Sequence, residues 1–108
     1  MSTPSPAAAP AAFRLGHFVS GRHVAGNSGR DGAVYNPATG ALRGHVAFAS
    51  AEEARSAIAA AEAALPGWSA VTPLQRARVM FRFKALLEAH ADELALLLTS
   101  EHGKVLSD

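Results

Sequence analysis

The side chains that could do chemistry in this sequence begin with five histidines, and their spacing decides what they could bind. No two of them stand four residues apart, and the chain has neither an H-E-x-x-H motif nor any cysteine. A zinc site needs three or four such ligands at short, regular spacings. The pattern therefore favours surface and loop histidines over metal ligands. The five are His17, His23, His45, His90 and His102.

A glycine-rich stretch over residues 26–32 raises the question of a phosphate cradle. Gly26, Gly29 and Gly32 fit neither G-x-G-x-x-G nor G-x-x-x-x-G-K-[ST], and no helix pattern follows them directly. We therefore expect this stretch to be a hairpin connection. Gly103-Lys104 also fails as a Walker motif, because Leu98 stands where the first glycine would be.

The basic side chains of residues 76–84 are candidates for binding an anion or a phosphate backbone. They are spread around the helix that this segment is expected to form, which favours a solvated surface. The whole chain has 10 Lys+Arg against 9 Asp+Glu, a net charge of +1. That balance argues against a nucleic-acid-binding arm, a polybasic membrane anchor or an acidic tail. The basic residues are Arg76, Arg78, Arg82 and Lys84.

Acidic pairs and nucleophiles give no catalytic constellation either. Glu52-Glu53 and Asp92-Glu93 stand at expected helix starts, where the helix dipole accounts for them. Without cysteine there is no thiol nucleophile and no disulfide. The residues themselves therefore predict no catalytic, no cofactor-binding and no metal-binding residue in this chain.

The first half of the chain, from Arg14 to about Ala49, has the pattern of short strands. Residues 18–19 and 23–24 flank Ser20-Gly21-Arg22, a hairpin signal. Residues 33–35 and 42–48 form a second candidate pair around Asn36-Pro37-Ala38-Thr39-Gly40, although Gly44 weakens the latter strand. We predict two small antiparallel hairpins.

Three helices are expected in the second half. Ser50 and Glu53 form a capping box for the first, whose predicted apolar face contains Ala54, Ile58, Ala61 and Leu65 and which we expect to end at Pro66-Gly67. Thr72 and Pro73 predict the start of the second, whose stripe is Val79, Met80, Phe83, Leu86 and Leu87. Asp92 is the expected cap of the third, which contains Leu94, Leu97, Leu98 and Glu101 and ends before Gly103.

The two termini and the composition limit what domain organisation this chain can have. Residues 1–13 are an Ala/Pro-rich leader without the charge and apolar run of a secretory signal, so we expect disorder there and a cytoplasmic protein. Of the 49% apolar residues, about 25 are alanine, so the core is thin. Ser107-Asp108 has the pattern of a further helix start, which is typical of a fragment.

In order along the chain, these stretches resemble the N-terminal part of the aldehyde dehydrogenase superfamily. The resemblance covers about 90 residues and becomes specific through the ordered set rather than any single motif. Its general motifs are Phe18-Val19-Ser20-Gly21, Val34 to Gly40, Ala57 to Ala64 ahead of Trp68, Arg76, and Glu101-x-Gly103-Lys104.

Further short motifs of this sequence resemble those of the CoA-acylating methylmalonate-semialdehyde dehydrogenases. Histidine within Glu101-His102-Gly103-Lys104 is the most telling, although Val105 stands where the superfamily commonly has proline. The other details are Gly16-His17-Phe18, Ser28-Gly29-Arg30, Arg76 to Phe81, and Phe83-Lys84-x-Leu86-Leu87.

The resemblance implies an α/β fold in which residues 14–108 are an incomplete N-terminal part of the NAD-binding domain. It implies oxidation of methylmalonate or malonate semialdehyde with NAD, giving propionyl-CoA or acetyl-CoA and CO2, in the context of valine catabolism. A cysteine thiolate would attack the aldehyde, and CoA would take the acyl group from it. Homodimers or homotetramers are implied as well.

None of the catalytic parts of such an enzyme lies in these 108 residues, so we expect the chain alone to be inactive. Two alternatives remain open. One is an aldehyde dehydrogenase that releases its acyl group to water. The other is a freestanding, non-catalytic interaction module that docks a helix face on a partner.

Overall fold

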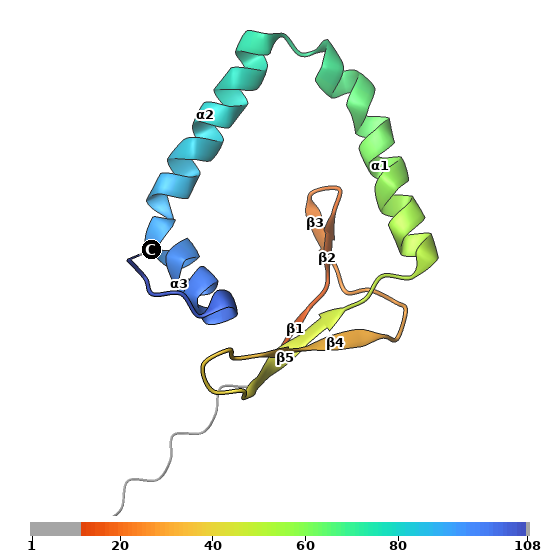
Figure 1. Cartoon of the computed structure of the whole chain (residues 1–108). Helices are drawn as coiled ribbons and strands as arrows, with labels where there is room; N and C mark the ends of the chain where they lie inside the picture. Colours follow the sequence, from red (N-terminus) through yellow and green to blue (C-terminus); the bar gives the residue numbers. More distant parts are fainter. Residues whose placement is uncertain (1–11, 108) are drawn as a thin grey trace, which may run out of the picture.

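Five short strands precede three helices in the computed structural model, which describes residues 12–107 (Figure 1). The strands are β1 (Phe13–Leu15), β2 (His17–Val19), β3 (Arg22–Val24), β4 (Asp31–Tyr35) and β5 (Leu42–Ala47). The helices are α1 (Ala51–Ala70), α2 (Pro73–Ala89) and α3 (Ala91–His102). The predicted α/β character and the strands-then-helices order are confirmed. No helix within the described range is long and apolar enough to cross a membrane.

Both predicted antiparallel hairpins are present. β2 pairs with β3 through a two-residue turn in which Ser20 and Gly21 have φ of 52° and 75°, the left-handed geometry that matches strand twist. β4 pairs with β5, and Asn36 shapes the connection between them by accepting from the backbone N–H groups of Ala38 and Thr39.

The parallel strand β1 was missed by the sequence prediction. It adds to β5, giving a three-stranded sheet of order β1-β5-β4, with Phe13 opposite Gly44. A Cβ at Gly44 would lie 2.3 Å from the carbonyl oxygen of Phe13, so the missing side chain is what lets β1 approach. Gly44 thus has low strand propensity of its own but leaves the space that allows β1 to pair with β5.

Two predicted boundaries need correction. Residues 1–11 of the predicted leader lie outside the described residues, but Phe13 belongs to β1 rather than to a disordered leader. Residues 26–30 do not close a hairpin, because they join β3 to β4 and these strands lie in different sheets. The predicted helix start at Ser107-Asp108 is untested, since Asp108 lies outside the described range and Ser107 is in a turn.

The capping box of α1 is confirmed, but the helix does not end at Pro66-Gly67. Ser50 accepts a hydrogen bond from the Glu53 N–H at 3.1 Å, and Glu53 accepts one from the Ser50 N–H at 2.8 Å. Pro66 lies inside α1, which continues for one turn to Ala70. Proline removes only one N–H donor, and the remaining helix bonds carry the chain past it.

The inward face of α1 differs from the predicted one. Ile58 and Leu65 are 68% and 59% exposed, whereas the half-buried positions are Ala57 and Ala60. The β2–β3 hairpin lies on that alanine side, because Phe18, Val19 and Ser20 line a hollow together with small α1 residues. The alanine members are Ala57, Ala60, Ala61 and Ala64. Small side chains thus set the approach of the hairpin, while the larger ones remain uncovered.

α2 begins as predicted, with Thr72 accepting from the Gln75 N–H and Pro73 in the first turn. The predicted cap of α3 is wrong. His90 both ends α2 and precedes α3, so the helix restarts at Ala91 and Asp92 is already in its first turn. Gly103 ends α3 with φ of 82°, the left-handed position that glycine adopts without a steric penalty.

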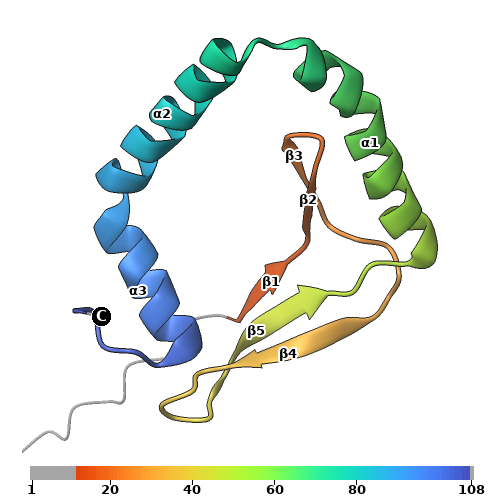
Figure 2. The same ribbon diagram turned by 45° about the horizontal axis from the view of Figure 1, so that its top comes forward.

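The helices form an open arc that leaves the sheet at one end and returns to it at the other, with the β2–β3 hairpin projecting inward (Figures 1 and 2). The radius of gyration of the described chain is 19.4 Å, compared with about 13 Å for a compact domain of this length. Within residues 12–107, Ala47 is the only buried apolar side chain. The fold as seen here has a sheet and three helices but almost no core.

Candidate functional site

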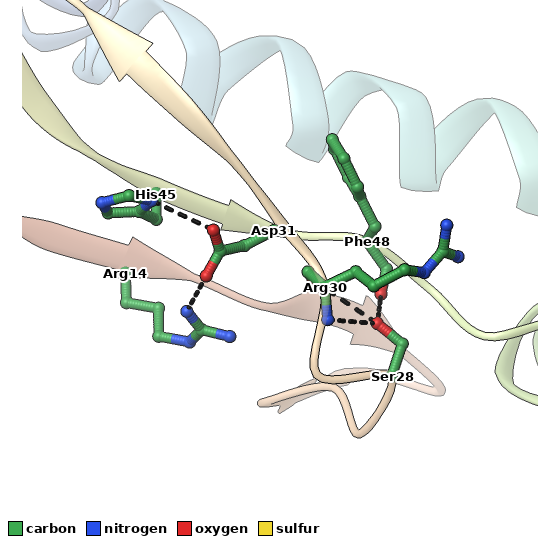
Figure 3. A network of polar contacts seen from close by, with 6 residues as sticks. All are labelled: Arg14, Ser28, Arg30, Asp31, His45 and Phe48. Carbon is green, nitrogen blue, oxygen red and sulfur yellow. Dashed lines mark hydrogen bonds and ion pairs between the residues drawn. The ribbon is translucent and has the colours of Figure 1, made fainter.

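A carboxylate shared by three strands is the most prominent polar feature of the sheet (Figure 3). Asp31 on β4 lies 2.6 Å from Arg14 Nη1 on β1 and 3.1 Å from His45 Nδ1 on β5. Register brings them together, since Arg14 stands opposite His45 in the parallel pair. The hydrogen bond from Arg14 is the main reason that the pKa of Asp31 lies below its ordinary value of 3.8.

This arrangement does not make a catalytic triad. Ser28, the nearby hydroxyl in Figure 3, donates to the Phe48 carbonyl oxygen and accepts from the Arg30 N–H at 3.1 Å. Its hydroxyl therefore serves the loop and is not hydrogen-bonded to His45. A nucleophile must be hydrogen-bonded to its base, or close to it. Arg14, Asp31 and His45, which we call the Asp31 cluster, hold the three strands together and offer no proton relay.

The glycine-rich loop is occupied by protein contacts rather than shaped for a phosphate. The Asn27 N–H donates to Glu53 Oε1 at 2.8 Å, and Arg30 donates to the Ala49 carbonyl oxygen at 3.1 Å. Glu53 thus pins the loop to the start of α1. The hydrogen bond from the Ser50 N–H is the main cause lowering the pKa of Glu53 below 4.5, assisted by that from Asn27. The N–H of Asn27 and the guanidinium of Arg30 are therefore engaged within the protein.

The histidines share no ligand cluster, since the described residues contain no group of three or more potential metal ligands. His45 faces Asp31, and His90 lies 3.0 Å from Glu93 within one helix turn. His17 is the exception in burial, because its Nε2 is enclosed without a hydrogen-bond partner in residues 12–107, close to Gly26.

The basic residues of α2 do not form a binding site with one another. Lys84 is paired with Glu88 one turn away, while Arg78 and Arg82 are exposed and Arg76 is half-buried. No described contact joins their guanidinium groups to a common partner. A solvated helix surface remains the interpretation of this segment.

Arg43 on β5 makes a contact that sequence reasoning missed. Its Nη1 donates to the Ser100 carbonyl oxygen at 3.0 Å and to Glu101 Oε1 at 2.6 Å, both in the last turn of α3. Its guanidinium carbon lies 5.4 Å from the ring centre of Phe13 on β1. No local pattern signals this contact, because its partners stand 57 and 58 residues later in the chain.

The largest candidate functional surface is the set of apolar helix side chains without a cover. α1, α2 and α3 contain no buried residue, and the predicted stripe of α2 is 37–60% exposed. Monomeric proteins rarely leave so many large apolar side chains of their helices without a cover. We call this the uncovered helix surface; it comprises Ile58, Leu65, Trp68, Leu74, Val79, Met80, Phe81, Phe83, Leu86, Leu87, Leu94, Leu96, Leu97 and Leu98.

Comparison with known proteins explains this incompleteness. Residues 23–108 match the description "Aldehyde dehydrogenase family". The chain belongs to the aldehyde dehydrogenase family. Malonate-semialdehyde dehydrogenase 3 of Geobacillus kaustophilus is 46% identical over 94 residues, which are 87% of this chain and 19% of that protein. The chain thus spans about a fifth of the length of its relative.

Solved structures of family members have the same N-terminal arrangement. An enzyme provisionally assigned as methylmalonate-semialdehyde dehydrogenase of Sinorhizobium meliloti 1021, complexed with NAD, matches with a TM-score of 0.88 at 45% identity. That match covers 93% of this chain and 20% of the solved one. The methylmalonate-semialdehyde dehydrogenase DddC of Oceanimonas doudoroffii gives a TM-score of 0.83 at 46% identity, over 87% and 19% of the two chains. The open arc is therefore the shape that this segment has within much longer proteins.

Proposed function

We propose that this chain is the N-terminal segment of an NAD-dependent, CoA-acylating dehydrogenase of methylmalonate or malonate semialdehyde. The observation that carries the proposal is the TM-score of 0.88 at 45% identity to a methylmalonate-semialdehyde dehydrogenase complexed with NAD. The 46% identical malonate-semialdehyde dehydrogenase supports the same substrate class. In the proposed reaction, semialdehyde, NAD and CoA give acyl-CoA, NADH and CO2. We also propose a role in valine catabolism.

The segment itself supplies structure rather than chemistry. Its sequence has no cysteine, so the nucleophile of such an enzyme must come from elsewhere. The described residues also do not fit NAD, because the glycine loop opens no helix and its Asn27 N–H is held by Glu53. We therefore propose that catalytic, cofactor and CoA contacts all lie outside these 108 residues and derive no step from the residues present.

Residues 14–108 are proposed to form an outer layer of the NAD-binding domain. Two observations support this role: the uncovered helix surface, and the near absence of buried side chains within residues 12–107, whose arc longer relatives share. Burial of apolar area is the main driving force of folding, so such a surface calls for a large apolar counterpart. The remainder of the domain would supply it. We further propose a cytoplasmic homodimer or homotetramer.

The test is an assay of a longer polypeptide that begins with this segment and has the length of its relatives. Malonate semialdehyde and NAD are supplied with and without CoA, and NADH and acetyl-CoA are both measured. The proposal expects CoA-dependent turnover with one acetyl-CoA for each NADH. Free acid released at full rate without CoA would reject acylation and favour the hydrolytic alternative. No NADH under either condition would reject the dehydrogenase itself.

A further inference from the structure

The guanidinium of Arg43 joins the sheet to the far end of the helical arc. Arg43 lies near the start of β5, the strand that leads into α1, yet it is hydrogen-bonded to Ser100 and Glu101 at the far end of the three helices. Figures 1 and 2 show the consequence, with the end of α3 brought back beside the sheet. The chain between these partners comprises all of α1 and α2 and most of α3.

Apolar packing does not supply an alternative way to place α3. No side chain of α1, α2 or α3 is buried, so none of the three helices rests on a core within residues 12–107. α2 and α3 have only a few contacts with each other. The position of α3 against the sheet therefore depends on polar contacts, namely those that Arg43 makes with Ser100 and Glu101.

The geometry of Arg43 suits that task. Its side chain is 26% exposed, less than that of any other residue in the ion pairs of the described chain. It neutralises a carboxylate, satisfies a carbonyl oxygen at the negative end of α3 and lies over the Phe13 ring. A planar guanidinium can do all three at once, whereas a lysine ammonium lacks the plane and the fork.

We infer that Arg43 is a latch that closes the helical arc against the sheet and fixes the direction in which the chain leaves α3 at Gly103. Gly103 lies close to Pro37 of the β4–β5 connection, because a Cβ built on it would be 3.5 Å from the Pro37 ring, an ordinary van der Waals distance. The latch is a property of the fold of this segment and does not depend on the proposed dehydrogenase activity. It predicts that loss of one side chain opens an arc whose helices remain intact.

The absence of cysteine allows this inference to be tested by site-directed spin labelling of the 108-residue chain. Cysteines replace Ala33 on β4 and Ala91 at the start of α3, both exposed alanines, and carry nitroxide labels. Pulsed electron paramagnetic resonance then measures the distance distribution between them. We expect a defined peak in the parent chain and its loss in Arg43→Ala, with the circular dichroism of the helices retained.

Two further variants make the result decisive. Lys84→Ala removes an ion pair that lies within α2 alone, so it should leave the peak unchanged. Arg43→Glu combined with Glu101→Arg restores the charge pair and should recover part of the peak, even if Arg43→Ala loses helix content. The inference would be overturned if Arg43→Ala left the distance peak unchanged, or if the parent distribution were as broad as that of Arg43→Ala. It would also be overturned if Arg43→Ala lost the peak and the charge swap did not recover it.

Discussion

Arg14 on β1 and Asp31 on β4 form an ion pair of 2.6 Å that reaches across the intervening strand β5. His45 on β5 meets the same carboxylate at 3.1 Å, so all three strands share one anion. β1 has only three residues, too few for its backbone pairing alone to hold it firmly. The Asp31 cluster therefore ties the N-terminal strand into the sheet.

This cluster predicts a loss of sheet stability in acid. The pKa of Asp31 is lowered in the folded chain, so its stabilising effect is fully present above its ordinary value of 3.8 and is lost as the pH falls through the lowered value. Hydrogen exchange of the β1 and β5 amides should speed up in that range, relative to the intrinsic rates. Asp31→Asn should already show weak protection at neutral pH, whereas Asp92→Asn, which removes an acid without a described ion pair, should behave like the parent. Equal protection in Asp31→Asn and the parent would contradict this role.

The capping box predicts the stability of α1. Ser50→Ala removes the acceptor of the Glu53 N–H and also the hydrogen bond that the Ser50 hydroxyl donates to Asn27 Oδ1 in the loop. We expect a cost of about 1 kcal/mol, measured from the thermal loss of helical circular dichroism. Ser56→Ala is the matched control, because it changes an exposed serine of the same helix to a better helix former. A similar effect of both substitutions would argue against the box.

Gly44 predicts how β1 is accommodated. Gly44→Ala would place a Cβ 2.3 Å from the Phe13 carbonyl oxygen, so β1 must move away from β5. Overpacking of this kind costs about 1–3 kcal/mol, and nuclear magnetic resonance should show loss of amide protection in β1. Gly67→Ala adds the same methyl group where α1 has open space and should stabilise the helix by roughly 1 kcal/mol. Undisturbed β1 protection in Gly44→Ala would show that the strands tolerate the contact.

The uncovered helix surface predicts the behaviour of the isolated 108-residue chain. We expect it to keep helical circular dichroism and to bind the dye ANS, because its apolar helix faces have nothing to pack on. We also expect no dehydrogenase activity from a chain without cysteine. Cooperative unfolding without ANS binding, together with a stable stoichiometric partner, would instead favour the freestanding interaction module. Phe83→Ser and Leu87→Ser, on the exposed face of α2, should reduce the ANS signal.

Local signals in the sequence were enough to place most elements. The turn residues Ser20 and Gly21, the Ser50–Glu53 capping box and the Thr72-Pro73 start each act within a few residues, so their structural outcome could be predicted. Pro66 and Asp92 misled the prediction, each for its own reason. A proline can be tolerated within one turn of a helix end, and a cap is unnecessary where His90 passes directly from one helix to the next.

The sequence by itself determined the types of all elements except β1, the family, and the absence of a thiol from these residues. These properties depend on residue identity and short spacings. Only the tertiary structure decided that β1 joins β5 in parallel, that α1 turns its alanines toward the hairpin, and that Arg43 meets Glu101 across 58 positions. Such contacts depend on which distant segments approach one another. That approach depends on space, such as the missing Cβ of Gly44, which no local pattern encodes.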